Sequence, residues 1–207
     1  MIDLRKFYDR VYCINLDCRP DKWEEAQKEF DKWGLTGIER YSGLVGGDLD
    51  VTPEKDMLPG EIGISMTHVE IIKQAKADGL NNIMIMEDDV YFSEDILRIG
   101  EFISQVPEDW CFMYFGGMQI GGDKPTIITP DIIKINQTLM IHCIAINSEM
   151  FDTIINEVPK LKAQVDYEYI GLQKTCPSYC TNPYIAFQRA GISDIQNKYV
   201  DYNMFYR

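Results

Sequence analysis

Residues 83–90 read Ile-Met-Ile-Met-Glu-Asp-Asp-Val, a short apolar run that passes without a spacer into three acids. Four consecutive large apolar residues predict a strand that is buried on both faces, as strands of parallel sheets are. A second run of this kind, Val-Tyr-Cys-Ile-Asn-Leu, occupies residues 11–16, and further strands are expected at 111–115 and 140–146. Buried strands that alternate with helical segments indicate an α/β sandwich with a mostly parallel central sheet.

Helical periodicity separates the predicted strands. We expect a first helix that starts near Pro20 and ends at Gly34, because proline favours a helix start and glycine a helix end. Its apolar stripe consists of Trp23, Ala26, Phe30 and Trp33, which recur at helical spacing. Ser65 is expected to cap a second helix that runs to about Asp78.

The bulk composition limits the classes of protein to consider. With 207 residues and 45% hydrophobic side chains, we expect one domain over residues 1–207 with a sizeable core. The formal net charge of −13 argues against a nucleic-acid partner, which requires a basic face. No apolar run approaches the roughly 20 residues of a transmembrane segment. The six cysteines lack the pattern of a disulfide framework, so we expect a reducing compartment.

The acids Glu87, Asp88 and Asp89 follow their strand at the edge where open α/β sheets bind ligands. An extended backbone would place Glu87 and Asp89 on one side and Asp88 on the other. Two neighbouring carboxylates need a positive charge between them, and Mn²⁺ or Mg²⁺ prefers such oxygen ligands. The pattern therefore favours a metal site with Glu87 and Asp89 as ligands. The alternative is a solvated acidic turn that caps a helix starting near Ser93.

The two histidines also allow more than one interpretation. After a cap at Ser65, His68 would lie in the first helical turn, near the positive end of the helix dipole, where it can hydrogen-bond an anionic ligand. A plain surface or capping role is an equally good interpretation. His142 lies inside the apolar run 140–146, which is more typical of a hydrogen-bonded core histidine than of a ligand.

Several short motifs occur along the chain in a characteristic order and spacing. They are Val11–Asp17 followed by Arg19-Pro20, Gly60–Gly63 followed by Thr67-His68, Ile83–Val90, Ala145–Ser148, Val165-Asp166, and Gln188 with Ser193–Ile195. Together they resemble glycosyltransferase family 25, the lipopolysaccharide and collagen galactosyltransferase type. Thr67 stands where that family usually has serine, and residues 145–148 match only loosely. The resemblance extends to compact domains of large algal DNA viruses that act as capsid-glycan glycosyltransferases.

The resemblance implies a GT-A fold with a Rossmann-like nucleotide-sugar-binding half, about 1–92, and an acceptor half, about 93–207. It further implies a metal-dependent transferase that uses Mn²⁺ or Mg²⁺ and moves a sugar from a nucleotide diphosphate sugar. We expect a UDP-sugar as donor, a hydroxyl of a glycan as acceptor, and inversion at the anomeric carbon. The expected location is the cytoplasm of a bacterium or of a virus-infected host cell.

The chemistry of this transfer assigns roles to particular residues. The nucleoside is expected at the end of the first strand, at Asn15, Leu16 and Arg19, although Arg19 is as readily interpreted as a surface cation. Asp166 is the expected base that accepts the proton of the acceptor hydroxyl; the alternative is an N-cap of a helix at 167–173. The remaining expected nucleotide-sugar contacts are Thr67, His68, Glu87, Asp88, Gln188, Ser193 and Asp194.

Two rival functions fit parts of the pattern. A phosphohydrolase with an aspartate nucleophile would need an isolated aspartate and a downstream lysine, whereas the acids here are contiguous. A nucleotide-sugar or carbohydrate-binding module without catalysis would be favoured by missing metal ligands, whereas the acidic cluster is intact. Release of nucleotide diphosphate from sugar donors, with and without Mn²⁺, discriminates between these possibilities.

Overall fold

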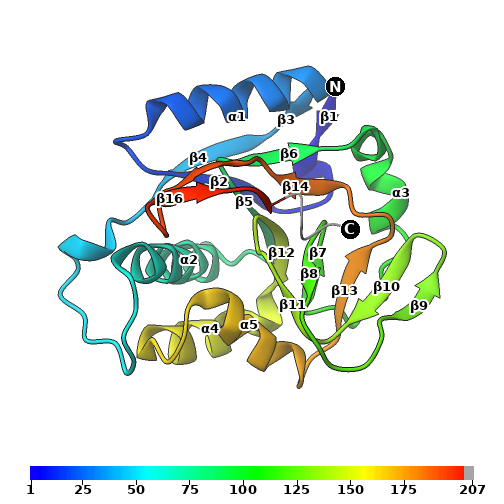
Figure 1. The fold of residues 1–207 in the computed structure, drawn as a ribbon. Helices are drawn as coiled ribbons and strands as arrows, with labels where there is room; N and C mark the ends of the chain where they lie inside the picture. Colours follow the sequence, from blue (N-terminus) through cyan, green and yellow to red (C-terminus); the bar gives the residue numbers. More distant parts are fainter. Residues whose placement is uncertain (203–207) are drawn as a thin grey trace.

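A computed structural model describes residues 1–202 and is built around a central eight-stranded sheet (Figure 1). In spatial order its strands are β4 (Ile38–Ser42), β2 (Arg10–Asn15), β5 (Asn82–Glu87), β12 (Cys143–Asn147), β7 (Phe112–Tyr114), β13 (Ser178–Thr181), β10 (Ile132–Ile135) and β9 (Thr126–Thr129). All of them point the same way except β12 and β10. The predicted α/β class is confirmed, with six of eight strands in one direction and antiparallel pairing confined to the neighbours of β12 and β10.

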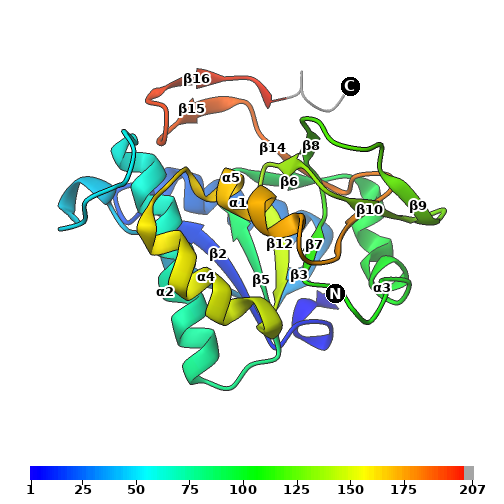
Figure 2. The ribbon, with the colours of Figure 1, turned by 90° about the horizontal axis from the view of Figure 1, so that it is seen from below.

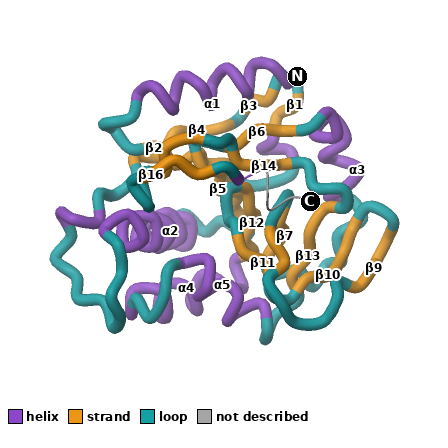
Figure 3. The backbone as a smooth tube through the Cα atoms, viewed as in Figure 1, coloured by secondary structure: helices purple, strands orange, loops and turns teal. Residues whose placement is uncertain are grey.

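Helices cover both faces of this sheet (Figure 1). The helices α1 (Pro20–Trp33) and α3 (Ile99–Ile103) pack on one face, and α2 (Pro59–Ala77), α4 (Phe151–Glu157) and α5 (Val165–Gln173) pack on the other. Figure 3 shows the same layers, with a long loop that joins β4 to α2. None of the helices in the described part of the chain is long and apolar enough to cross a membrane.

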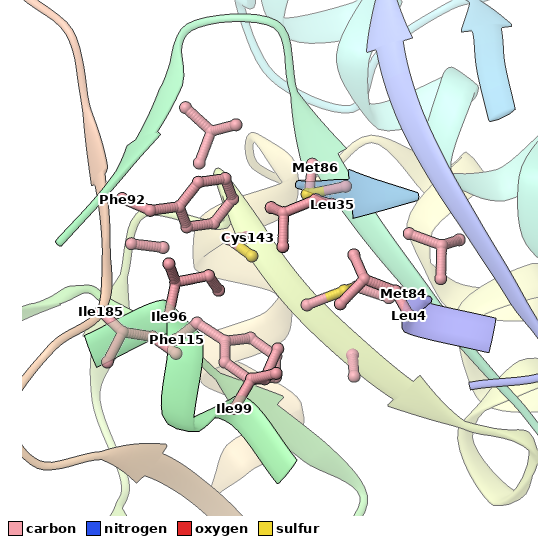
Figure 4. Packing of buried hydrophobic residues seen from close by; sticks show 14 of the residues in the cluster. Leu4, Leu35, Met84, Met86, Phe92, Ile96, Ile99, Phe115, Cys143 and Ile185 are labelled. Carbon is pink, nitrogen blue, oxygen red and sulfur yellow. The ribbon is translucent and has the colours of Figure 1, made fainter. Parts of the chain in front are cut away.

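Strand β5 contributes to both cores because its side chains alternate. Met84 and Met86 belong to the core beneath α1, whereas Ile83 and Ile85 belong to the core beneath α2. Figure 4 shows the two methionines packed among other apolar side chains, including Phe92 from the neighbouring segment. Burial on both faces explains why this strand reads as a continuous apolar run.

Helix α1 has the ends expected from the sequence. Pro20 occupies its first turn, and Gly34 ends it with φ of 64°, a left-handed conformation that glycine adopts without strain. Ala26 and Phe30 are buried, and the tryptophans at both ends of the stripe pack partly against the same core. The start of α1 directly follows the loop after β2, so its first turn lies at the edge where β2 ends.

Helix α2 begins seven residues earlier than expected, at Pro59 instead of after Ser65. Glu61 accepts a hydrogen bond from the Leu58 backbone N–H at 2.8 Å, so proline and glutamate together define the first turn. The Ser65 hydroxyl instead donates to the Glu61 carbonyl, 2.7 Å away, inside the helix. The expected place of His68 near the positive end of the dipole is therefore wrong, because His68 lies in mid-helix.

Small strand pairs complete the fold. These are β1 (Ile2–Asp3) with β3 (Leu35–Thr36), β8 (Met118–Gln119) with β11 (Thr138–Leu139), β6 (Val90–Phe92) with β14 (Ala186–Gln188), and β15 (Gly191–Ser193) with β16 (Lys198–Val200). The pairing of β6 with β14 brings the C-terminal part of the chain to the acidic cluster. In Figure 2 the hairpin of β15 and β16 lies across one end of the molecule, away from the central strands.

Candidate active site

Strands β2 and β5 end side by side. They pair in parallel with Ile14 opposite Glu87, so Asn15 and the acidic cluster lie at the same edge of the sheet. A cavity of about 430 Å³ is located there. Its volume lies in the range of small-molecule sites, and its position is the one at which open α/β sheets bind ligands.

Most of the residues expected from the sequence converge on this cavity. The expected residues that line it are Asn15, Leu16, Thr67, Glu87, Asp88, Asp89, Asp166, Gln188, Ser193 and Asp194. Arg19 reaches Asp194 at its rim. His68 is not among the lining residues. Segments from five distant parts of the chain therefore form one site, and the individual roles of these residues stay predictions.

The acidic cluster is a turn, which changes the expected orientation of its members. Strand β5 ends at Glu87, and Asp88 and Asp89 form the turn before β6. Strand alternation therefore stops at Glu87, and all three acids line the same cavity. The expectation that Asp88 faces the opposite side is wrong for this reason.

Each aspartate of the turn is held by a neighbouring amide. Asp88 Oδ2 accepts a hydrogen bond from Asn15 Nδ2 at 2.7 Å. Asp89 lies 3.5 Å from Gln188 Nε2, because β14 pairs with β6 and places Gln188 opposite Val90. The two carboxylates are thus fixed before any ligand arrives.

The cluster concentrates negative charge where water is scarce. Burial, together with the charge of Asp88, raises the pKa of Asp89 to about 6. Burial, together with the charges of Asp89, Asp166 and Asp88, raises the pKa of Glu87 well above its ordinary value. Each rise shows that ionised carboxylates are disfavoured here, so a bound cation would relieve the repulsion.

The chemistry of these donors suits a hard divalent cation. Within residues 1–202, no three His, Cys, Asp or Glu side chains are arranged as a ready metal site. Mg²⁺, however, is usually held by one or two carboxylates, with substrate phosphates and water as its other ligands. Glu87 and Asp89 fit such a partial shell by chemistry and by mutual repulsion, and they stay the predicted ligands.

Asn15 organises the site through three hydrogen bonds of its side-chain amide. Its Oδ1 accepts from Arg40 Nε at 2.9 Å, and its Nδ2 donates to Asp88 and to the Arg19 carbonyl. Arg40 also pairs with Asp17 at 2.7 Å. The side chain of Asn15 therefore positions Asp88, and both of its N–H donors are used within the protein.

Lys22 is a member of the site that the sequence analysis missed. Its Nζ lies 2.6 Å from Asp194 and 4.0 Å from Asp88, and it lines the cavity. Burial alone would lower the pKa of Lys22, but the hydrogen bond to Asp194 and the nearby acids outweigh burial and raise it. Arg19 pairs with Asp21 at 2.8 Å and also with Asp194. The sequence feature that could have identified Lys22 as a site residue is its place in the first turn of the helix that follows β2.

Asp166 lies in the first turn of α5 and lines the same cavity. Gln164 is the N-cap of that helix, so the alternative that Asp166 caps it is wrong. Asp166 Oδ2 accepts the backbone N–H of Met140 at 3.0 Å, and Met140 has the unusual φ of 73°. Burial raises the pKa of Asp166 to about 6, although the hydrogen bond from Met140 opposes the rise.

The two tyrosines that follow Asp166 do not line the cavity. Tyr169 is fully buried, and its hydroxyl lies 3.1 Å from His68 Nδ1. Burial lowers the pKa of His68 to about 3, so the imidazole is neutral. Tyr167 is exposed and does not line the cavity. His142 is completely buried in the core, as expected.

Comparisons with known proteins identify the family of the chain. The sequence model of "Glycosyltransferase family 25 (LPS biosynthesis protein)" matches residues 50–168, more than half of the chain. The match contains helix α2, the acidic cluster and Asp166. It leaves out Asn15, Lys22 and the segment from Gln188 to Asp194.

Individual relatives are distant and much longer. The human protein "Inactive glycosyltransferase 25 family member 3" is 24% identical over 141 residues, which cover 58% of this chain and 24% of the relative. The "Procollagen lysyl hydroxylase and glycosyltransferase" of Acanthamoeba polyphaga mimivirus is 24% identical over 155 residues, which cover 62% and 17%. The chain thus spans about a quarter or less of the length of these relatives.

Similar solved structures include a glycosyltransferase involved in the glycosylation of the major capsid of PBCV-1. The two sequences are 12% identical, and the superposition covers 77% of this chain and 68% of the other chain, with a TM-score of 0.44. The family match over residues 50–168, with the acidic cluster inside it, is the finding that decides the assignment. The chain belongs to glycosyltransferase family 25.

Proposed function

We propose that this domain transfers a sugar from a UDP-sugar to a hydroxyl group of a glycan, with a divalent metal and with inversion at the anomeric carbon. One observation carries the proposal: the acidic cluster and Asp166 come from different elements and line a single cavity. A donor diphosphate at the cluster and an acceptor at Asp166 would then meet inside it. Both ends of the reaction have a candidate group in the same space.

Glu87 and Asp89 are the residues that would hold Mn²⁺ or Mg²⁺. When bound, the metal supplies Lewis-acid stabilisation of the negative charge that grows on the leaving diphosphate. Asn15 and Gln188 would keep the neighbouring carboxylates in place, since each donates to one aspartate of the turn.

Asp166 would accept the proton of the acceptor hydroxyl. As the acceptor oxygen bonds to the anomeric carbon, the bond from that carbon to the diphosphate oxygen breaks, and the hydroxyl proton passes to the carboxylate. A pKa near 6 makes Asp166 ionised at neutral pH and a stronger base than an ordinary aspartate. The Met140 N–H holds the oxygen that is not needed for this proton.

Leu16 and the loop that follows β4 would contain the nucleoside. Residues 43–46 of this loop line the cavity, and Thr67 anchors it by accepting the Leu44 N–H at 2.9 Å. The Thr67 hydroxyl itself donates to the Gly63 carbonyl at 2.7 Å. Thr67 therefore supports the wall of the donor pocket, and the backbone of the loop supplies the polar groups that face a ligand.

The proposal is tested by incubating the protein with UDP-, GDP- and CMP-sugars, with Mn²⁺ or with EDTA, and measuring the free nucleotide released. We expect release from a UDP-sugar only with the metal, and at least about a hundredfold less from Asp166→Asn, since a general base contributes about 10²–10⁴-fold. A human relative carries the word inactive in its name, which favours one second candidate, a nucleotide-sugar-binding module. Donor-dependent thermal stabilisation without release from any sugar would establish that module and refute the transferase.

A further inference from the structure

The turn between β15 and β16 closes one side of the cavity. We call residues 193–196 the strap; all four of them line the cavity, although they lie more than a hundred residues from the acidic cluster. The Ser193 hydroxyl accepts the Gln196 N–H at 3.2 Å, which tightens the turn. Figure 2 shows this hairpin lying across the end of the molecule.

Charge holds the strap to helix α1. Asp194 pairs with Lys22 at 2.6 Å and also with Arg19, so one carboxylate joins two cations. The exposed fraction of the side chain is only 29% for Asp194, 15% for Lys22 and 24% for Arg19. Partly buried charge-assisted hydrogen bonds of this kind are stronger than pairs at an open surface.

Close packing holds the strap to helix α2. A methyl group added at Gly60 would lie 2.5 Å from the Ile195 Cα, a distance that the two backbones cannot accommodate without moving. Only glycine at this position lets the strap approach the helix so closely. The strap therefore contacts α1 on one side and α2 on the other.

The charges that line the cavity leave one role unfilled. Among the lining residues in the described part of the chain, Lys22 is the single cation, against Glu87, Asp88, Asp89, Asp166 and Asp194. A diphosphate carries acceptor oxygens that ammonium and guanidinium groups bind as they bind carboxylates. Asp194 thus presents to Lys22 the kind of oxygen that a donor would present.

We propose that Lys22, with Arg19 beside it, is the protein's own binding group for the donor diphosphate, and that Asp194 occupies this pair until a donor displaces the strap. The inference rests on the proposed function of the same site. A diphosphate and the Asp194 carboxylate cannot share the two cations without like-charge repulsion. Donor binding therefore exchanges one partner for the other and releases the strap, which makes Asp194 an internal competitor of the substrate.

The test is calorimetric titration of inorganic pyrophosphate in EDTA and low salt, so that no metal contributes and screening is weak. Asp194→Asn is expected to bind about tenfold more tightly than the wild type, because the neutral amide forms a weaker bond with the cations. Lys22→Gln is expected to bind at least about tenfold more weakly for the same reason. Asp78→Asn is the matched control: Asp78 pairs with Arg10 at 2.6 Å with similar exposure, away from the cavity.

The sign of the Asp194→Asn effect decides the question. If Asp194 contributes to donor binding, as a metal ligand or a diphosphate contact, the substitution weakens binding or leaves it unchanged, and either result overturns the inference. In the Lys22→Gln background the gain from Asp194→Asn should shrink, because one of the two contested cations is gone. Thermal midpoints show whether each variant is folded. If Asp194→Asn is unfolded, Lys22→Gln alone tests the proposal, and a wild-type affinity of Lys22→Gln for pyrophosphate refutes it.

Hydrogen exchange supplies a second readout. Pyrophosphate should speed exchange at residues 193–196 in the wild type, and Asp194→Asn should do so without any ligand. Failure of this inference is separable from failure of the proposed function. If the protein turns over a UDP-sugar with Mn²⁺ but Asp194→Asn binds pyrophosphate with unchanged affinity, only the inference is refuted. If the pyrophosphate affinities are as expected but no nucleotide sugar is turned over, only the proposed function is refuted.

Discussion

Asp166→Asn is expected to stabilise the protein at neutral pH while it removes most of the activity. The carboxylate lines the cavity, and its burial makes the charged form costly. Asparagine keeps the shape and the oxygen that accepts the Met140 N–H, but it carries no charge. A structural aspartate would give the opposite pattern, in which its loss costs stability and leaves turnover unchanged.

The size of the stability effect follows from the pKa of Asp166, which burial raises from 3.8 to about 6. A raised carboxyl pKa favours the folded state most below pH 3.8, and this advantage is lost as the pH rises through 6. The difference corresponds to an upper bound of about 3 kcal/mol, which the partial exposure of Asp166 reduces to about 1–2 kcal/mol. Asp166→Asn should therefore raise the melting temperature by about 2–8 °C at pH 7.5, and by much less at pH 4.

The assay pairs thermal melts at pH 4 and 7.5 with turnover of a UDP-sugar in Mn²⁺. Wild-type kcat/KM should rise as the pH increases through about 6, where Asp166 loses its proton, and Asp166→Asn should show a weaker rise that is due to the predicted metal ligand Asp89. Asp152→Asn, an exposed aspartate paired with Lys76 on the surface, serves as the control. Near wild-type turnover by Asp166→Asn, or a lower melting temperature at pH 7.5, would refute the reasoning.

Two further substitutions probe the walls of the pocket. Gly63→Ala would place a methyl group 2.4 Å from the Leu44 carbonyl oxygen. We expect a loss of about 1–3 kcal/mol in the free energy of unfolding, as for other overpacked sites. An unchanged midpoint of urea unfolding would contradict this close contact. Arg40→Ala removes the hydrogen bond to Oδ1 of Asn15 and so loosens the hold of Asn15 on Asp88. The affinity for UDP in Mn²⁺ should fall about threefold to tenfold, the effect of one hydrogen bond. Calorimetry that shows no change in affinity would exclude a role of Arg40 in the site.

Local patterns were sufficient to predict the elements that lead into the site. Strand β5 and helix α1 were predicted because continuous apolar residues, and a stripe bounded by Pro20 and Gly34, are strong local signals. The start of α2 was missed because Ser65 was weighed above Pro59 and Glu61, the pair that defines the first turn. Local rules conflicted there, and the stronger capping signal determined the helix start.

The composition of the site was only partly accessible from the sequence. Asp88 was assigned to the wrong side because nothing local shows that β5 ends one residue before it. Lys22 was missed because a lysine on an amphipathic helix reads as solvated, and its partner Asp194 lies far away in the sequence. Gln188 and Asp194 entered only through the family resemblance, because their place depends on the pairing of β14 with β6 and on the path of the strap.

The central claim is that the acidic cluster binds a nucleotide diphosphate through a divalent metal. The most direct measurement is calorimetric titration of UDP into the wild type and Asp89→Asn, each in Mn²⁺ and in EDTA. Asparagine keeps the shape of Asp89 and its neighbour Gln188 but removes the charge that a metal needs. We expect Mn²⁺ to tighten UDP binding to the wild type and to have no effect on binding to Asp89→Asn. Equal tightening by Mn²⁺ in both proteins would contradict the central claim.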